Sequence, residues 1–160
     1  MRKSLVPGTF DPITFGHLDV IRRASRMSDE VVVGIAASMN KRGGTLFTLD
    51  ERVELARAVT AEFDNVEVVP FENLLVDFAT SIGVTAIVKG LRATTDFEYE
   101  FQMAMLNYRL APELETLFVM SSPDYMYVSS SIAKELASLH GSTESIVPPL
   151  VGEALAKRLG

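Results

Sequence analysis

The sequence predicts an α/β fold: a single-domain, Rossmann-like, doubly wound sheet of five parallel strands with helices on both faces. Two observations favour this fold. Short apolar segments alternate with helical patterns along the whole chain, an order typical of parallel sheets. The 160 residues suffice for one domain with a sizeable core. No repeat, low-complexity tract or linker divides the chain, so residues 1–160 are expected to form one domain.

The strands are expected where short apolar segments are bounded by turn-forming residues. These segments are residues 4–6, 30–36, 66–69, 85–89 and 115–120. Proline and glycine are expected to end two of them, at Pro7-Gly8 after the first strand and at Pro70 after the third. The loop after the fourth strand is expected to begin at Gly90.

Helical patterns begin near residue 16 and recur at about residues 48–62, 74–82, 95–110, 129–139 and 150–159. In the first of them, Leu18, Ile21 and Ala24 share one face, which is expected to be buried. Side chains of serine, threonine and asparagine accept hydrogen bonds from the free N–H groups at a helix start. The expected N-terminal caps are Thr48, Asn73, Thr95 and the serine run at 129–131.

Composition narrows the class of protein. The net charge of −6 argues against a broad nucleic-acid-binding surface, which needs a basic patch. No apolar stretch reaches the length of a membrane span, and the start of the chain lacks the features of a signal peptide. Cysteine is absent, which excludes disulfides and thiolate metal sites. We therefore expect a cytoplasmic protein that binds neither nucleic acid nor membranes.

Ligands of doubly wound sheets bind outside the carboxyl ends of the strands, where the strand order reverses. Glycines, cations and hydroxyls gather in the segments that follow the predicted strands. Those segments are residues 8–17, 38–41, 71–75, 89–92 and 121–131. The sequence therefore predicts that they converge on one crevice.

The first of these segments suits a phosphate-bearing ligand. Gly8 would let the backbone approach a ligand, and a helix start offers free N–H groups with a partial positive charge. His17 falls in the first helical turn. A neutral imidazole there donates one hydrogen bond, and a protonated one stabilises phosphoryl charge. The alternatives are an ordinary Pro-Gly turn and a solvated histidine.

Further candidates have simpler alternatives beside them. Lys89 and Arg92 flank a glycine and could hold a phosphate, or form a solvated basic turn. Lys41 lies in a polar loop, where solvated lysines are common. The serines at 129–131 could bind an anion or only cap a helix. The carboxylates at 96–100 fit the first turn of a helix better than a metal site.

A family resemblance sharpens this interpretation. The run Pro7-Gly8-Thr9-Phe10-Asp11-Pro12-Ile13-Thr14-Phe15-Gly16-His17 contains Thr-x-Gly-His, which resembles the (H/T)-x-G-H signature of nucleotidyltransferases. The run as a whole looks like the phosphopantetheine adenylyltransferase family. Further similar segments are Gly90-Leu91-Arg92, Asp96-Phe97-Glu98-Tyr99-Glu100 and the serine run. The resemblance implies transfer of the adenylyl group of ATP to 4′-phosphopantetheine, giving dephospho-coenzyme A and pyrophosphate in coenzyme A biosynthesis. It also implies in-line attack without a covalent enzyme intermediate.

The resemblance assigns roles to particular residues. His17 and Lys41 would be catalytic. ATP would contact Thr9, Phe10, His17, Gly90, Leu91, Arg92, Glu100, Tyr125, Met126, Tyr127, Val128, Ser129, Ser130 and Ser131. The acceptor substrate would contact Thr9, Lys41, Leu74, Leu75 and Lys89. Mg²⁺ would accompany ATP without a protein metal site. The family is typically a homohexamer inhibited by coenzyme A.

Two other hypotheses remain open. A related enzyme could transfer a cytidylyl group, or adenylylate nicotinamide mononucleotide. Those relatives more often carry histidine where this chain has Thr14, which counts against them. The chain could instead be a non-catalytic module that senses ATP or coenzyme A. The presence of His17, Lys41, Lys89 and Arg92 together argues against this, because none is needed for folding.

Overall fold

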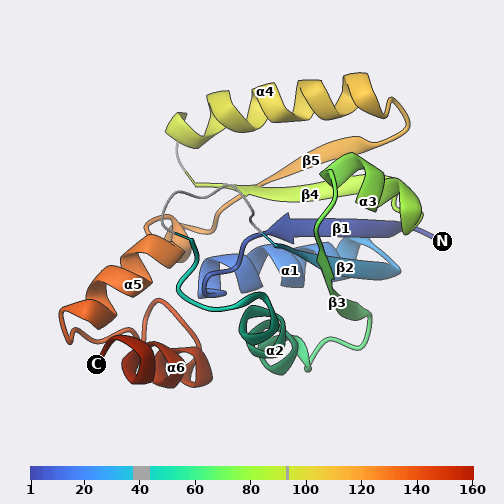
Figure 1. Ribbon diagram of the computed structural model, residues 1–160. Coiled ribbons are helices and arrows are strands. Elements are labelled where there is room, and N and C mark those ends of the chain that lie inside the picture. Colours follow the sequence, from blue (N-terminus) through green and yellow to red (C-terminus); the bar gives the residue numbers. More distant parts are fainter. Residues whose placement is uncertain (38–43, 93) are drawn as a thin grey trace.

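The structure is a computed structural model that describes residues 1–37, 44–92 and 94–160. A single parallel sheet runs through it in the order β3-β2-β1-β4-β5 (Figure 1). The strands are β1 (Lys3–Gly8), β2 (Glu30–Ala36), β3 (Val66–Phe71), β4 (Ala86–Leu91) and β5 (Glu115–Met120). This order confirms the predicted doubly wound fold, and the order reverses between β1 and β4.

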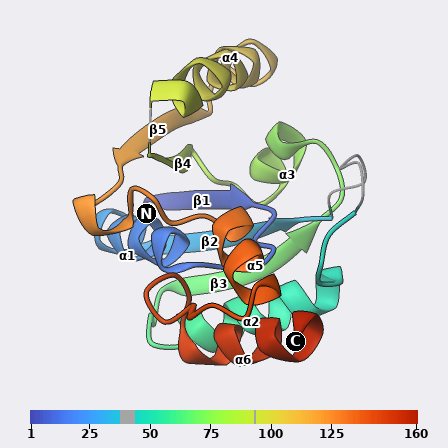
Figure 2. The ribbon, with the colours of Figure 1, turned by 90° about the vertical axis from the view of Figure 1, so that its left-hand side faces the viewer.

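Helices connect successive strands and complete the C-terminal part of the chain. They are α1 (Phe15–Met27), α2 (Leu49–Thr60), α3 (Leu75–Ser81), α4 (Thr94–Leu110), the short 3₁₀ helix η1 (Pro123–Tyr125), α5 (Ser130–Ser138) and α6 (Pro149–Leu159). Figure 2 shows α3 and α4 on one side of the sheet and α2, α5 and α6 on the other. The predicted covering of both faces is therefore confirmed.

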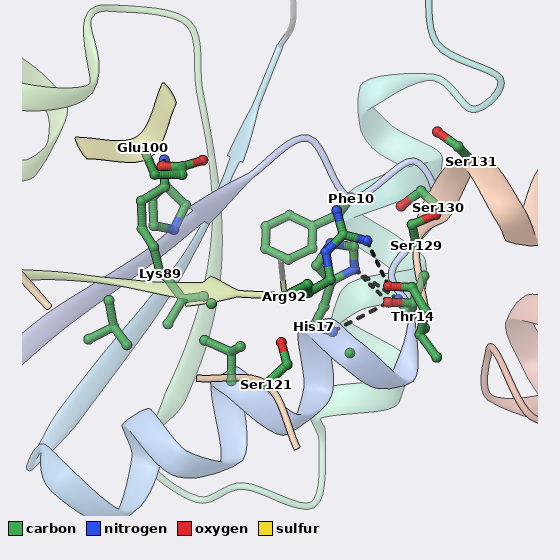
Figure 3. A pocket seen from close by; sticks show the side chains of 17 residues that line it. Phe10, Thr14, His17, Lys89, Arg92, Glu100, Ser121, Ser129, Ser130 and Ser131 are labelled. Carbon is green, nitrogen blue, oxygen red and sulfur yellow. Dashed lines mark hydrogen bonds and ion pairs between the residues drawn. The ribbon is translucent and has the colours of Figure 1, made fainter. Parts of the chain in front are cut away.

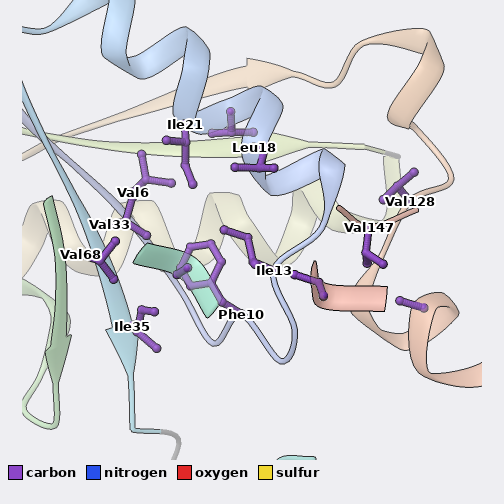
Figure 4. Close-up of a cluster of buried hydrophobic side chains, with 14 of the residues drawn as sticks. Val6, Phe10, Ile13, Leu18, Ile21, Val33, Ile35, Val68, Val128 and Val147 are labelled. Atoms are coloured by element: carbon purple, nitrogen blue, oxygen red, sulfur yellow. The ribbon is translucent and has the colours of Figure 1, made fainter. Parts of the chain in front are cut away.

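Two apolar clusters hold the helices against the sheet. There is one on each face, because successive side chains of a strand point to opposite faces. Val6 and Val33 pack against residues of α1, α2, α5 and α6 in the larger cluster, which also contains Phe10 and Ile13 (Figure 4). Leu5 belongs to the smaller cluster, with side chains of α3. The larger cluster thus lies directly beneath the loop that joins β1 to α1.

The predicted end of the first strand is wrong in an informative way. β1 continues through Pro7 and Gly8, which pair with Gly34 and Ile35 of β2. Its pairing with β4 includes only Ser4 and Leu5. Proline has no N–H to donate to a ladder. The sheet is therefore left unpaired between the carboxyl ends of β1 and β4.

The third strand and its helix also differ from the prediction. Pro70 lies inside β3, where a proline is tolerated because β3 is an edge strand. Asn73 does not cap α3. The N-cap is Leu74, which makes no capping hydrogen bond through its side chain. The start of α3 is set by tertiary packing, since Val76, Phe78 and Ala79 are buried against the sheet.

The region after the fourth strand shows a third difference. β4 runs on to Leu91, so Gly90 lies in the strand and not in a loop. α4 begins at Thr94, one residue before the predicted cap at Thr95. The other two predicted caps are confirmed. Thr48 accepts a hydrogen bond from the backbone N–H of Glu51, and Ser129 accepts one from Ile132.

Candidate active site

A cavity of about 300 Å³ lies between the carboxyl ends of β1 and β4, where these strands are no longer paired. This is the position where the strand order reverses. Several predicted site residues line the cavity together: Phe10, His17, Lys89, Gly90, Arg92, Glu100, Val128, Ser129, Ser130 and Ser131 (Figure 3). Three of the five segments predicted from the strand ends, residues 8–17, 89–92 and 121–131, therefore converge, and Glu100 of α4 joins them. Residues 71–75 do not line the cavity, and residues 38–41 lie outside the described residues.

His17 is fixed by the start of α1. Thr14 is the N-cap of this helix, and its hydroxyl accepts a hydrogen bond from the backbone N–H of His17 at 3.3 Å. In return, the backbone N–H of Thr14 donates to Nδ1 of His17 at 3.0 Å. Thr14 and His17 thus form a capping box in which histidine takes the place usually held by a glutamate.

The surroundings of His17 set its protonation state and the position of its ring proton. Burial, and to a smaller extent the nearby positive charge of Arg92, together lower the pKa of His17 from 6.5 to about 4. The imidazole is therefore neutral at physiological pH. Because Nδ1 accepts the hydrogen bond from Thr14, the ring proton resides on Nε2. His17 can then donate a hydrogen bond, but it carries no charge.

Phe10 packs against His17 from the loop before the helix. The two rings meet edge to face with centroids 4.8 Å apart. Phe10 is 3% exposed, and its backbone has a φ of 51°. A Cβ atom on Gly8 would lie 3.0 Å from the Phe10 ring. The sequence analysis expected Gly8 to let the backbone approach a ligand. The structure adds a second role, because the absence of a side chain at Gly8 leaves room for the Phe10 ring.

Arg92 and the serine run close the other side of the cavity. Nη1 of Arg92 donates to the carbonyl oxygen of Val128 at 2.8 Å, which ties the chain after β4 to the segment before α5. Ser129 caps α5. The hydroxyl of Ser130 donates to the carbonyl oxygen of Pro12 at 2.7 Å. Ser129 and Ser130 therefore have structural roles, and together with Ser131 they place the start of α5 at the cavity.

Lys89 and Glu100 form an ion pair in the cavity, with Nζ of Lys89 2.5 Å from Oε2 of Glu100. Lys89 comes from β4 and Glu100 from α4. Figure 3 shows them at one end of the cavity, with His17, Arg92 and the serines at the other. The cavity is therefore polar at both ends.

Other predicted residues do not line the cavity. They are Thr9, Leu74, Leu75, Leu91, Tyr125, Met126 and Tyr127. The side chain of Leu74 is exposed, and Leu75 packs against the smaller apolar cluster. Lys41 lies outside the described residues. Their assigned contacts stay predictions.

The sequence analysis missed two charged residues that hold the loop between β1 and α1. Arg52 is 1% exposed, and its Nη1 donates to the carbonyl oxygens of Thr9 and Ala36, both at 2.8 Å. It lies next to Val53 on the buried stripe of α2, and a charge on such a stripe was the available signal. Asp11 is also buried and had no comparable signal.

Among the residues that the structure describes, no group of three or more histidine, aspartate or glutamate side chains could hold an ion. In the same described part of the chain, no helix is long and apolar enough to cross a membrane.

Comparisons with known proteins agree with the geometry. Residues 5–136 match the Cytidylyltransferase-like family. The chain is 54% identical over 160 residues to a phosphopantetheine adenylyltransferase from Moorella thermoacetica, covering 100% of this chain and 99% of the relative. It is 52% identical over 159 residues to one from Streptomyces coelicolor, covering 99% and 98% of the two chains. A Vibrio parahaemolyticus structure assigned as a nicotinate-nucleotide adenylyltransferase superposes with a TM-score of 0.71, covering 98% of this chain and 99% of that one. Its 16% identity supports the shared fold alone.

Proposed function

Because the chain belongs to the phosphopantetheine adenylyltransferases, within the cytidylyltransferase-like family, we propose that it transfers the adenylyl group of ATP to 4′-phosphopantetheine. The products are dephospho-coenzyme A and pyrophosphate, which makes the reaction a step of coenzyme A biosynthesis. The single observation that carries the proposal is the neutral, Nε2-protonated His17 beside Arg92, at the helix start that borders the cavity.

The reaction needs no proton transfer to begin. An oxygen of the acceptor phosphate is already an anion, and it attacks the α-phosphorus of ATP in line with the leaving group. One P–O bond forms, the bond between the α-phosphorus and the bridging oxygen breaks, and pyrophosphate leaves with that electron pair. Negative charge builds up on the α-phosphoryl oxygens. The Nε2–H of His17 would donate to one of them and stabilise the transition state.

The remaining cations would position the two substrates. Arg92 would bind the β- and γ-phosphates of ATP, where a planar guanidinium can make two parallel hydrogen bonds. Lys89 would bind the acceptor phosphate, together with Lys41. The N–H groups at the starts of α1 and α5 would add partial positive charge. Catalysis would then consist of positioning and charge stabilisation.

Mg²⁺ would enter with ATP as part of the substrate. The described residues offer no cluster of three acidic or histidine ligands, and Mg²⁺ commonly keeps phosphate oxygens and water as ligands. Its contribution would be to neutralise the triphosphate and the departing pyrophosphate.

Three further expectations accompany this function. We propose that the enzyme works in the cytoplasm, is inhibited by coenzyme A and forms a homohexamer. An apolar surface on α4 and β5 supports assembly. Its exposed members include Phe97, Phe101, Met105, Tyr108 and Leu117. Sedimentation velocity measurements of the purified chain would test the hexamer.

The proposal is tested by pyrophosphate release. ATP and Mg²⁺ would be offered with 4′-phosphopantetheine, nicotinamide mononucleotide or glycerol 3-phosphate in separate reactions, with CTP as an alternative donor. Release with ATP and phosphopantetheine alone is the expected result. Release with another pair would replace the substrate and keep the chemistry. Nucleotide binding without release from any pair would favour the sensor hypothesis.

A further inference from the structure

The ion pair between Lys89 and Glu100 joins two side chains that the family resemblance assigns to different substrates, Lys89 to the acceptor and Glu100 to ATP. Their charged atoms are 2.5 Å apart, and their side chains are only 22% and 21% exposed. Oε2 of Glu100 is buried and has no hydrogen-bond partner among the described residues other than this contact with Lys89. In the protein without ligands, Lys89 therefore supplies the positive charge that neutralises the Glu100 carboxylate.

A phosphate at Lys89 would disturb this arrangement. It brings negative charge next to the Glu100 carboxylate, in a half-buried position where water screens charges poorly. Two anions of this kind compete for one ammonium group. Glu100 would lose its partner and repel the phosphate unless it found a donor elsewhere.

A donor is available in the second substrate. A ribose offers hydroxyl groups that can donate to a carboxylate. The resemblance had placed Glu100 beside ATP, whereas the structure places it against the lysine assigned to the acceptor. Both observations fit if Glu100 exchanges one partner for the other.

We propose that the Lys89–Glu100 ion pair couples the binding of the two substrates. In the free protein each side chain neutralises the other. The acceptor phosphate takes Lys89 and releases Glu100 to the nucleotide, and the nucleotide takes Glu100 and releases Lys89 to the acceptor. Each substrate thus raises the affinity for the other by the same factor, because coupling between binding sites is reciprocal. This inference rests on the proposed function for the identity of the substrates.

The competing interpretation is a purely structural ion pair that fastens α4 to β4. That interpretation predicts a loss of stability when the pair is broken. It predicts no change in the coupling between ligands, so the two interpretations separate in a binding experiment.

The test is isothermal titration calorimetry with 4′-phosphopantetheine and an ATP analogue that has a methylene group in place of the oxygen between the α- and β-phosphates, so that no transfer occurs. Each ligand is titrated alone and in the presence of the other. Wild type is expected to show a coupling of about fivefold or more. Glu100→Gln removes the charge that competes for Lys89. We expect it to bind phosphopantetheine alone several-fold more tightly and to lose most of the coupling. Unchanged coupling in Glu100→Gln would overturn the proposal.

Glu98→Gln is the matched control. It removes the same charge from the same helix, but Glu98 is exposed and does not line the cavity. We expect it to keep the wild-type coupling, and loss of coupling in both variants would refute the specific role of Glu100. Glu100→Asp, which keeps the charge on a shorter side chain, should retain part of the coupling. It also serves if Glu100→Gln does not fold.

A titration with inorganic phosphate separates this proposal from the proposed function. Phosphate should bind more tightly to Glu100→Gln than to wild type, whichever acceptor the enzyme uses. If wild type and Glu100→Gln bound phosphate with equal affinity, the proposal that Glu100 competes with phosphate for Lys89 would be wrong, even if wild type released pyrophosphate as expected. Absence of pyrophosphate release with tighter phosphate binding would instead refute only the proposed function.

Discussion

Nζ of Lys134 lies 3.1 Å from Oδ2 of Asp11, although the two residues are 123 positions apart in the sequence. The carboxylate of Asp11 also accepts hydrogen bonds from the backbone N–H groups of Leu46 and Phe47, both at 2.9 Å. Asp11 therefore joins three segments: the loop between β1 and α1, the segment before α2, and α5. Through these contacts it holds the loop that presents Phe10 and His17 to the cavity.

Replacing Asp11 by asparagine should destabilise the protein. The asparagine side chain has one oxygen that can accept a hydrogen bond, whereas both carboxylate oxygens of Asp11 accept one. Asparagine also carries no charge, so Lys134 would lose its counter-ion. We expect a loss of about 1–3 kcal/mol in unfolding free energy, measured by urea denaturation at pH 7. Asp64→Asn removes an exposed carboxylate and should cost much less. An equal loss in both variants would contradict the role of Asp11.

The same substitution should also change the pH dependence of stability. Burial by itself would raise the pKa of Asp11, but the hydrogen bonds from Phe47 and Leu46 and the contact with Lys134 hold the pKa below its ordinary value of 3.8. A lowered pKa in the folded state stabilises the protein above pH 3.8 and ceases to do so as pH falls through the folded value. The advantage of wild type over Asp11→Asn should therefore be complete at neutral pH and shrink below about pH 4.

Removing the His17 side chain should slow the chemical step. We expect His17→Ala to lower kcat by about 10²–10³-fold with a small change in the KM for ATP, because the lost donor acts on charge that develops in the transition state. His140→Asn is the control, since His140 is exposed and its φ of 58° suits asparagine. Steady-state kinetics of both variants would show whether the effect belongs to His17.

His17 should also make stability fall in mildly acidic solution. Its pKa is about 4 when folded and ordinarily 6.5, so the unfolded chain takes up a proton first as pH falls. The contribution is complete above pH 6.5, decreases from there to pH 4, and amounts to about 3 kcal/mol. His17→Gln should lack this decrease in denaturation curves between pH 7 and pH 4.5. A variant with the wild-type slope would show that another group titrates.

Gly90 brings β4 into close contact with α1. A Cβ atom on Gly90 would lie 2.8 Å from Cγ2 of Val20, a stiff side chain that also lines the cavity. We expect Gly90→Ala to cost about 1–3 kcal/mol in stability. The double variant Gly90→Ala with Val20→Ala should recover part of this loss, because the clash is removed. If the double variant lost as much stability as the two single variants together, the proposed clash between residues 90 and 20 would be wrong.

Arg52 should matter for stability and for activity. Arg52→Met removes two charge-assisted hydrogen bonds that join the ends of β1 and β2, and we expect a loss of about 1–3 kcal/mol. We also expect a lower kcat, because Thr9 begins the loop that carries Phe10. Arg57→Met is the control on the same helix, since Arg57 is exposed and donates one longer bond of 3.2 Å to Val68. Equal effects of the two substitutions would contradict this account.

The sequence by itself determined the succession of strands and helices along the chain and the end of the sheet where the site lies. Apolar periodicity and helix caps depend on neighbours a few residues apart, so they can be read locally, and Thr48 and Ser129 cap their helices as predicted. Parallel strands then bring their carboxyl ends together, which is why His17, Lys89 and Arg92 could be placed at one crevice from the sequence.

Only the tertiary structure decided the state of these groups. The neutral form of His17 follows from burial and from the charge of Arg92, 75 positions further along the chain by their numbers. The pairing of Lys89 with Glu100 and of Asp11 with Lys134 joins separate elements. The continuation of β1 through Pro7 and of β3 through Pro70 likewise depended on which neighbours each strand has. Desolvation, ion pairing and ladder partners are properties of non-local contacts, and no local pattern in the sequence encodes them.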